Sequence, residues 1–195
     1  MKVVIIKYNA GNIRSVLFAL ERIGVNAIVT DDHNEIRSAD RVIFPGVGEA
    51  SSAMQYLREK GLDTLICSLV QPVLGICLGM QLMCTHSEEN NTNCLGIFDQ
   101  KVKLFPSAGF KVPQIGWNNI TNIKSTLFKG IAENAYMYFV HSYYVESCVN
   151  AIAETDYIQK YSSAVCKNNF YAVQFHPEKS GEFGQKILEN FINEI

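Results

Sequence analysis

A cysteine flanked by glycines is the residue in this sequence best suited to covalent chemistry. Cys77 stands in Gly75-Ile76-Cys77-Leu78-Gly79, between a run expected to form a strand and a run expected to form a helix. A nucleophile on such a sharp turn needs small neighbours, because the backbone approaches closely there. The helix N-terminus favours the thiolate, and the N–H of Leu78 can face a developing oxyanion. The same pentapeptide is equally compatible with a buried structural cysteine between two turn glycines.

A thiolate nucleophile requires a base, and the four histidines are His33, His86, His141 and His176. His176 ends the apolar run Tyr171–Phe175 and is followed by Pro177 and Glu178. Glu178 can reach back to orient the imidazole, which is the role of the third group in a triad. Alone, this segment is more simply interpreted as a solvated turn. Its combination with the cysteine turn favours a Cys77-His176-Glu178 triad.

The segment Pro45-Gly46-Val47-Gly48 follows another predicted strand. Its two glycines permit unusual backbone dihedrals, so its N–H groups can turn toward the thiol. A plain strand-to-helix turn explains this segment equally well.

These segments must be positioned by a sheet. Apolar runs at 3–6, 27–30, 41–44 and 72–76 are typical of buried strands, and helical patterns at 13–23, about 51–60 and 78–83 alternate with them. This order predicts an α/β fold with a mostly parallel, doubly wound central sheet flanked by helices. Sites of such sheets lie beyond the carboxyl ends of the strands, where both Cys77 and His176 are expected.

The second half of the sequence predicts additional antiparallel strands. Strand patterns lie at 101–105, 137–140, 151–153 and 171–175, and a last helix begins near residue 181. Residues 86–96 are polar and are expected to form a surface loop. Because no linker or repeat interrupts the pattern, we expect a single domain over residues 1–195.

Composition excludes several classes of protein. The 195 residues are 48% hydrophobic and 18% charged with a net charge of −2, which argues against disorder and against binding to nucleic acid or anionic lipid. No apolar run reaches the roughly 20 residues of a membrane span, and the opening run is too short for a signal peptide. We therefore expect a cytoplasmic protein. Its six cysteines show no CxxC spacing, so we expect neither disulfides nor a metal site, and most of them buried.

The sequence as a whole resembles the class-I, triad-type glutamine amidotransferases, and most closely the glutaminase subunits of imidazole glycerol phosphate synthase. The resemblance runs in order through the chain. Its segments are Tyr8, Gly11-Asn12, Arg14-Ser15-Val16, Pro45–Gly48, Gly75–Gln81, Lys111-Val112-Pro113, Gly116-Trp117-Asn118, Phe139–Tyr144 and Val173–Gly181.

The resemblance implies a flavodoxin-like or Rossmann-like fold and the hydrolysis of L-glutamine to glutamate and ammonia, without a cofactor. Cys77 would form a glutamyl thioester, His176 would carry the proton and Glu178 would hold the imidazole. The N–H groups of Val47 and Leu78 would form the oxyanion hole. The implied glutamine contacts are Gly48, Gln81, Glu89, Ser142 and Tyr143. A surface-loop role is the alternative for Glu89.

The resemblance also implies a (β/α)8 cyclase subunit as heterodimer partner. Ammonia released into water would be protonated, so it would pass through the barrel, where imidazole glycerol phosphate is made for histidine biosynthesis. The interface candidates are Asn12, Trp117, Tyr136 and Lys179. The alternatives are core packing for Trp117 and a solvated turn for Lys179.

One departure from the family pattern leaves the partner and pathway open. Lys7-Tyr8-Asn9 stands where the family usually has Asp-Tyr-Gly, and Lys7 reverses a charge. A paralogous glutaminase that supplies ammonia to a surface-sugar pathway is therefore an alternative. A cysteine hydrolase or chaperone of the same fold is disfavoured, because Leu78 rather than a histidine follows the cysteine. A non-catalytic binding protein is disfavoured by the intact triad.

Overall fold

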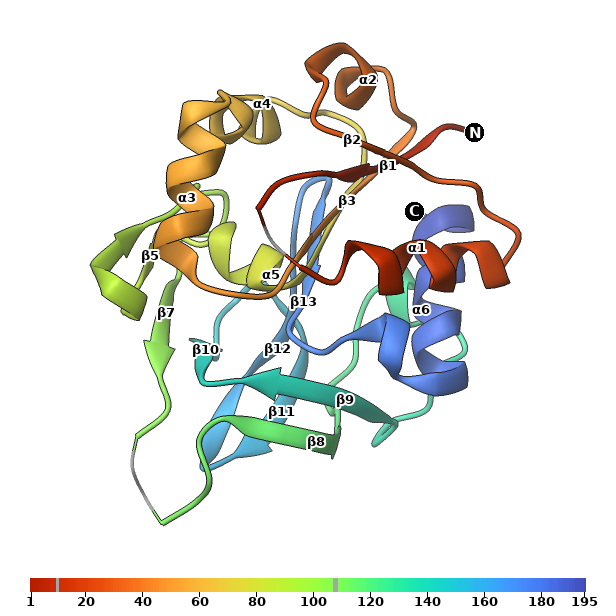
Figure 1. Cartoon of the computed structure of the whole chain (residues 1–195). Helices are drawn as coiled ribbons and strands as arrows, with labels where there is room; N and C mark the ends of the chain where they lie inside the picture. Colours follow the sequence, from red (N-terminus) through yellow and green to blue (C-terminus); the bar gives the residue numbers. More distant parts are fainter. Residues whose placement is uncertain (10, 107–108) are drawn as a thin grey trace.

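The chain forms one long mixed sheet and one short sheet, with helices on both faces of the long one (Figure 1). The computed structural model describes residues 1–9, 11–106 and 109–195. The strands are β1 (Val3–Ile6), β2 (Ile28–Thr30), β3 (Arg41–Gly46), β4 (Val73–Cys77), β5 (His86–Ser87), β6 (Thr92–Asn93), β7 (Lys101–Leu104), β8 (Gln114–Asn119), β9 (Tyr136–His141), β10 (Tyr143–Glu146), β11 (Ala151–Tyr157), β12 (Gln159–Lys167) and β13 (Phe170–Val173). The helices are α1 (Ile13–Arg22), α2 (His33–Arg37), α3 (Ala50–Glu59), α4 (Leu62–Cys67), α5 (Leu78–Leu82) and α6 (Gly181–Asn193), with short 3₁₀ turns η1 (Glu89–Asn91), η2 (Thr126–Phe128) and η3 (Pro177–Lys179).

The long sheet has a parallel half and a mostly antiparallel half. Its strand order is β2-β1-β3-β4-β13-β12-β10-β7-β5-β6, and β11 pairs with β12. Strands β2, β1, β3, β4 and β13 run parallel, whereas β13, β12, β10 and β7 pair antiparallel. The predicted α/β fold, with antiparallel strands supplied by the second half, is confirmed. Strand β13 lies where the two halves meet.

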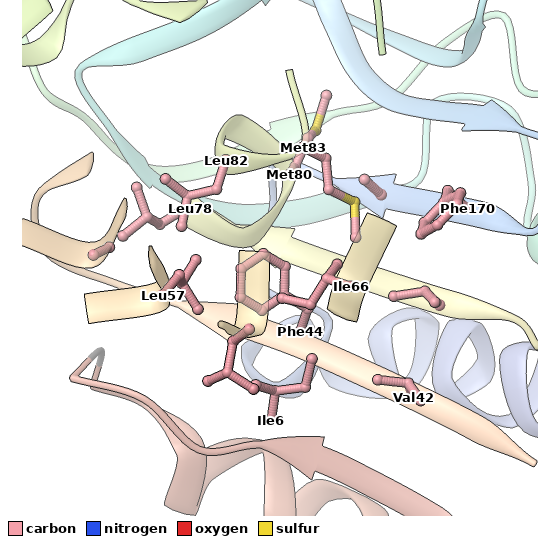
Figure 2. Packing of buried hydrophobic residues seen from close by; sticks show 14 of the residues in the cluster. Ile6, Val42, Phe44, Leu57, Ile66, Leu78, Met80, Leu82, Met83 and Phe170 are labelled. Atoms are coloured by element: carbon pink, nitrogen blue, oxygen red, sulfur yellow. The ribbon is translucent and has the colours of Figure 1, made fainter. Parts of the chain in front are cut away.

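Two apolar cores, one on each face of the parallel half, hold the helices in place. Side chains alternate along a strand, so Val4 and Ile6 of β1 enter one core, and Val3 and Ile5 enter the other. Both faces are covered, which is why β1 is apolar throughout. The first core contains residues of α3, α4 and α5 around Phe44 (Figure 2). The second core contains the buried sides of α1 and α6.

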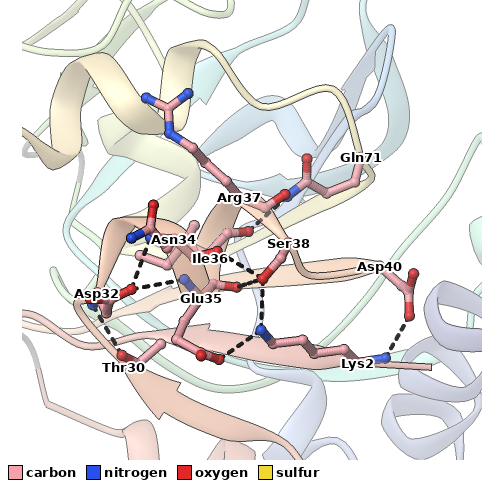
Figure 3. Close-up of polar contacts among 10 residues, drawn as sticks. All are labelled: Lys2, Thr30, Asp32, Asn34, Glu35, Ile36, Arg37, Ser38, Asp40 and Gln71. Carbon is pink, nitrogen blue, oxygen red and sulfur yellow. Dashed lines mark hydrogen bonds and ion pairs between the residues drawn. The ribbon is translucent and has the colours of Figure 1, made fainter.

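The short helix α2, which follows the edge strand β2, has a side-chain cap. The carboxylate of Asp32 accepts hydrogen bonds from the N–H groups of Asn34 and Glu35, both at 2.9 Å, at the start of α2 (Figure 3). At the other end of α2, the ammonium of Lys2 donates to Ser38 at 2.7 Å and pairs with Glu35 at 2.6 Å. Helix α2 is only five residues long, so these contacts, rather than helix propensity, stabilise it.

Replacing Asp32 with alanine should lower the free energy of unfolding by about 1 kcal/mol, because two N–H groups at the start of α2 lose their acceptor. Chemical denaturation measures this difference. The control is Asp31→Ala, which removes a neighbouring charge but leaves the cap in place. An equal loss in both variants would contradict a capping role.

The expectation of a surface loop at 86–96 is wrong, because this segment forms a small hairpin. His86 pairs with Asn93, and Ser87 pairs with Thr92. The polar side chains bond back to the backbone: Ser87 accepts from the N–H of Glu89 at 3.2 Å, and Thr92 donates to the carbonyl of Glu89 at 2.6 Å. These local bonds let Ser87 and Thr92 be buried.

The six cysteines are free thiols in the structure. Cys77 and Cys84 are buried, Cys67 is exposed, and the other three are partly buried, so the expectation that most are buried is wrong. Within residues 1–9, 11–106 and 109–195, no group of three or more His, Cys, Asp or Glu side chains is arranged to hold a metal ion. None of the helices in these ranges is long and apolar enough to cross a membrane.

Candidate active site

A cavity of about 310 Å³ lies at the carboxyl ends of β3, β4 and β13. Nine of the residues singled out from the sequence as catalytic, oxyanion-hole or substrate-contact positions line it: Val47, Gly48, Cys77, Leu78, Gln81, Glu89, Ser142, Tyr143 and His176. Lys179, an interface candidate, also lines it. Glu178 lies behind His176, with its side chain fully buried. The topology therefore brings together segments that are far apart in the chain, from Val47 to Lys179.

Cys77 is the junction between a strand and a helix. It is the last residue of β4, and Leu78 is the first residue of α5. Its backbone has φ 54° and ψ −109°, a left-handed conformation that an L-residue with a side chain adopts only under strain. The turn is tight because α5 packs onto β3: a Cβ at Gly79 would lie 1.9 Å from the carbonyl oxygen of Phe44. Glycine at position 79 is thus required by this close approach.

The turn containing Val47 lies beside the cysteine turn. Gly46 on β3 is paired with Cys77 on β4, so Val47 and Leu78 follow equivalent positions on neighbouring parallel strands. The buried Tyr8 hydroxyl donates to the carbonyl of Pro45 at 2.6 Å and fixes the start of this turn. A Cβ at Gly46 would lie 2.3 Å from the same hydroxyl oxygen. The loop after β1 therefore holds the turn that carries the Val47 N–H.

His176 and Glu178 form a buried pair just after β13. The imidazole Nδ1 lies 2.7 Å from Oε1 of Glu178, and the two side chains are 2% and 0% exposed. A carboxylate can only accept, so Nδ1–H donates to Glu178 and Nε2 is left to act as the base. The backbone of His176 is fixed as well, because its N–H donates to the carbonyl of Tyr138 at 2.9 Å and its carbonyl accepts from Ser180 at 2.7 Å.

The charge state of His176 is set by its neighbours. Burial of the imidazole disfavours its protonated form. Hydrogen bonds to Cys77 and Glu178, together with their negative charges, outweigh burial and raise the pKa of His176 to about 10. His176 is therefore a base strong enough to accept the proton of the thiol, which is how a cysteine nucleophile is activated.

Asn12 lies against the triad, which its sequence position did not suggest. Its side-chain amide donates to Oε1 of Glu178 and lies 3.4 Å from Nδ1 of His176. Its backbone is left-handed, with φ 74°, which turns the chain into α1 and directs the amide inward. The other carboxylate oxygen of Glu178, Oε2, is buried and has no hydrogen-bond partner among the described residues. A Gly-Asn pair signals a turn, but no sequence signal places it beside residue 178.

The second buried histidine of the cavity is held neutral. Burial lowers the pKa of His141 to about 4. Its Nδ1–H donates to the carbonyl of Tyr143 at 2.8 Å, and its Nε2 lies 3.2 Å from the hydroxyl of Tyr161. A neutral imidazole with both nitrogens engaged is not free to act as a base. His141 instead fixes the strand end that supplies Ser142 and Tyr143 to the cavity.

Glu89 and Gln81 contribute polar side chains to the wall of the cavity. Oε2 of Glu89 accepts from the N–H of Ala50 at 2.8 Å, at the start of α3. Burial raises the pKa of Glu89, and that hydrogen bond opposes the shift. The Gln81 amide donates to the carbonyl of Tyr143 at 3.0 Å. Glu89 is therefore a cavity residue, fixed by the start of α3, rather than part of a loop without contacts.

The remaining interface candidates lie on the surface. Trp117 on β8 is 56% exposed and Tyr136 on β9 is 57% exposed, so Trp117 is not a core residue. The register of the short sheet pairs Trp117 with Tyr138 and Asn119 with Tyr136, which places Trp117 and Tyr136 on one face. Lys179 is exposed at the edge of the cavity. All three side chains are therefore accessible to a partner.

The sequence also matches known proteins. Curated relatives include subunit HisH of imidazole glycerol phosphate synthase from Bacteroides fragilis, 59% identical over 98% of this chain and 99% of the relative. The same subunit from Bacteroides thetaiotaomicron is 57% identical over 99% of this chain and all of the relative. That from Haemophilus influenzae is 45% identical over all of this chain and 98% of the relative.

Solved structures share the fold at low sequence identity. A glutamine amidotransferase aligns with a TM-score of 0.75 and 17% identity, over 96% of this chain and 98% of that chain. PurLQS from Thermotoga maritima aligns with a TM-score of 0.73 and 18% identity, over 99% of this chain and 98% of that chain. The family described as Glutamine amidotransferase class-I matches residues 4–195. The chain therefore belongs to the class-I glutamine amidotransferase family.

Proposed function

We propose that this chain, as one domain over residues 1–195, is the glutaminase subunit of imidazole glycerol phosphate synthase. The observation that carries the proposal is the buried His176–Glu178 pair in the same cavity as the strained Cys77. Relatives that are 45–59% identical along the whole chain bear the name of this subunit. They favour the histidine pathway over the surface-sugar alternative. We place the protein in the cytoplasm, where this pathway operates.

The reaction begins with transfer of the Cys77 proton to Nε2 of His176. The sulfur then attacks the side-chain carboxamide carbon of glutamine, a C–S bond forms, and the carbonyl electron pair moves onto oxygen. The N–H groups of Val47 and Leu78 stabilise that oxyanion. When the C–N bond breaks, the imidazolium gives its proton to the leaving nitrogen, and ammonia departs from a glutamyl thioester.

Hydrolysis of the thioester uses the same groups, with water as the nucleophile and the Cys77 sulfur as the leaving group. His176 removes a proton from water as it attacks the thioester carbon. The C–S bond then breaks, glutamate leaves, and the proton returns to the sulfur. Throughout the cycle Glu178 orients the imidazole and stabilises its positive charge. The sum is glutamine plus water giving glutamate plus ammonia, with no redox change and no cofactor.

Substrate recognition is assigned to the polar groups of the cavity. The carboxylate of Glu89 would meet the ammonium of glutamine, since it lies at the wall formed by the start of α3. Gly48, Gln81, Ser142 and Tyr143 would hold the rest of the amino acid through backbone and side-chain polar groups. The cavity volume of about 310 Å³ suits an amino acid of this size.

A glutamine-analogue electrophile tests the function. A diazoketone analogue of glutamine should add its mass to Cys77, and excess glutamine should protect the thiol. Iodoacetamide, which lacks the amino-acid part of the analogue, is the control reagent for labelling that does not depend on glutamine recognition. Labelling of the exposed Cys67 measures general thiol reactivity. Labelling of Cys77 without protection by glutamine, measured with the partner subunit present, would contradict a glutaminase.

The partner is a (β/α)8 cyclase that receives the ammonia. Trp117, Tyr136 and Lys179 form the proposed docking face, because the first two are exposed aromatic side chains and the third lies at the edge of the cavity. Asn12, the fourth interface candidate, contacts the triad through Glu178. Lys7, the departure from the family pattern, is exposed, so its charge can alter docking without altering the cavity.

Replacing Lys179 with alanine should raise the Kd of the complex roughly three- to tenfold, because an exposed charge at an interface contributes modestly. Isothermal titration against the cyclase measures this change. Lys186→Ala, on the exposed side of α6, is the control and should leave the Kd unchanged. An unaltered Kd in Lys179→Ala would exclude this lysine from the interface.

A further inference from the structure

A buried glutamine contacts the sulfur of Cys77, and the mechanism above does not use it. Gln174 is fully buried directly after β13, and its Nε2 donates to Sγ of Cys77 at 3.6 Å. Strands β13 and β4 are parallel neighbours with Val173 opposite Ile76, so the next residue on each strand is Gln174 and Cys77. The contact is therefore fixed by the register of the sheet.

The amide oxygen of Gln174 is bonded to a residue that lines the cavity. Oε1 of Gln174 accepts from Nε2 of Gln81 at 3.0 Å, and that same Nε2 also donates to the carbonyl of Tyr143 at 3.0 Å. The backbone N–H of Gln174 donates to the carbonyl of Ser163 at 2.8 Å, which holds the residue in place. One chain of hydrogen bonds thus runs from the sulfur to residues that line the substrate cavity.

The acceptor at the sulfur end is weak unless Cys77 is ionised. A neutral thiol is a poor acceptor, whereas hydrogen bonds to ionised groups are about twice as strong as neutral ones. A fully buried amide is costly to leave without partners, so its position beside the sulfur needs a compensating interaction. The neutral thiol donates to the carbonyl of Val140 at 3.8 Å, so only the ionised sulfur would give the amide a strong acceptor, and the amide N–H would in turn favour the thiolate.

We propose that Gln174 is a catalytic residue whose side-chain N–H stabilises and orients the Cys77 thiolate, while its amide oxygen positions Gln81. This inference rests on the proposed glutaminase function, because Gln174 is catalytic only if Cys77 is the nucleophile. His176 accepts the proton, and Gln174 fixes the direction of the sulfur lone pairs. As the C–S bond forms and the sulfur loses its charge, the hydrogen bond weakens without any movement of the strand.

The test is the pH dependence of Cys77 alkylation by iodoacetamide, read by mass spectrometry, in the full chain. Gln174→Met keeps the approximate volume but removes both hydrogen bonds. The midpoint of its alkylation profile should rise by about one pH unit, the effect of one lost charge-assisted hydrogen bond. With the cyclase present, its kcat for glutamine hydrolysis should fall roughly tenfold.

Two comparison variants separate this role from simple packing. Gln81→Met removes the donor to Gln174 but leaves the N–H on the sulfur, so it should raise KM while moving the alkylation midpoint little. Asn190→Leu removes another buried amide, which donates to the carbonyls of Leu127 and Lys129 far from the cavity. It should lower stability without moving the midpoint. A folded Gln174→Met protein with the wild-type midpoint would overturn the proposal.

A measurement on the unmodified protein covers the case in which Gln174→Met does not fold. The ¹⁵N-labelled side-chain amide of Gln174 should change its chemical shift as the Cys77 thiol titrates, and it should lose that response in Cys77→Ala. An amide shift that ignores the thiol titration would overturn the proposal. Neither alkylation nor the amide shift requires glutamine. A protein that shows both effects but hydrolyses no glutamine would refute the proposed function alone.

Discussion

Cys77→Ala should lose glutamine hydrolysis by at least about 10⁴-fold, because no other group in the cavity can form the thioester. The cyclase in the same complex should still make its product from added ammonium. Coupled assays with glutamine and with ammonium, run on one preparation, measure both activities. The two results together separate the loss of the nucleophile from the loss of the complex.

The matched control is Cys67→Ala, which removes an exposed thiol outside the cavity and should leave both activities unchanged. Release of the strain at position 77 is not expected, because alanine would occupy the same left-handed backbone. If Cys77→Ala also lost ammonium-dependent synthesis, the residue would have a structural role at the partner interface that the triad does not explain.

Glu178→Gln should lower kcat by about 10²- to 10⁴-fold while leaving the fold intact, since an amide of the same shape replaces a buried carboxylate. An amide nitrogen directed at Nδ1 would favour the wrong imidazole tautomer. The side chain of Asn12, which donates to the carboxylate, would meet a second donor in that orientation. The pKa of His176 should fall from about 10, because one of the two groups that raise it loses its charge.

The stability of the variant provides an independent check through its pH dependence. In the wild type the pKa of His176 is raised above its ordinary value of 6.5, so the imidazolium stabilises the fold fully below pH 6.5. That contribution is lost as pH rises toward about 10. The difference in unfolding free energy between wild type and Glu178→Gln should therefore become smaller as the pH rises from 6.5 to about 10. Glu182→Gln, an exposed change on α6, is the control, and a difference independent of pH would contradict the assignment.

The parallel half of the fold was predictable because its strands are buried on both faces. Val3–Ile6 and the strand before Cys77 are continuous apolar runs, which sequence patterns detect directly. Strands β8, β10 and β12 were not predicted. Strand β12 buries Ser162 and Ser163, so its apolar pattern is interrupted. Helices α2 and α4 were missed as well, because five or six residues are too few to establish a helical period.

Site residues were predictable where a reactive side chain follows an apolar strand. They were not predictable where the contact arises only because the fold brings distant segments together. Cys77 and His176 follow apolar strands, so their shared edge could be predicted. The contact between Asn12 and Glu178 spans 166 positions, and that between Gln174 and Cys77 spans 97. Asn12 has no local signal of burial, because a polar side chain in a turn is ordinarily solvated. Gln174 lies within the apolar run 171–175, but nothing in the sequence indicates that its side chain faces Cys77.

The pairing of β4 with β13 has a consequence for control of the enzyme. These parallel neighbours carry the nucleophile and the base, so main-chain hydrogen bonds of the sheet set their separation. A bound partner could not pull the two apart without breaking the centre of the sheet. Any switch that silences the free subunit must therefore act outside the paired strands, at the peptide of Val47 or in the turn that carries Glu178.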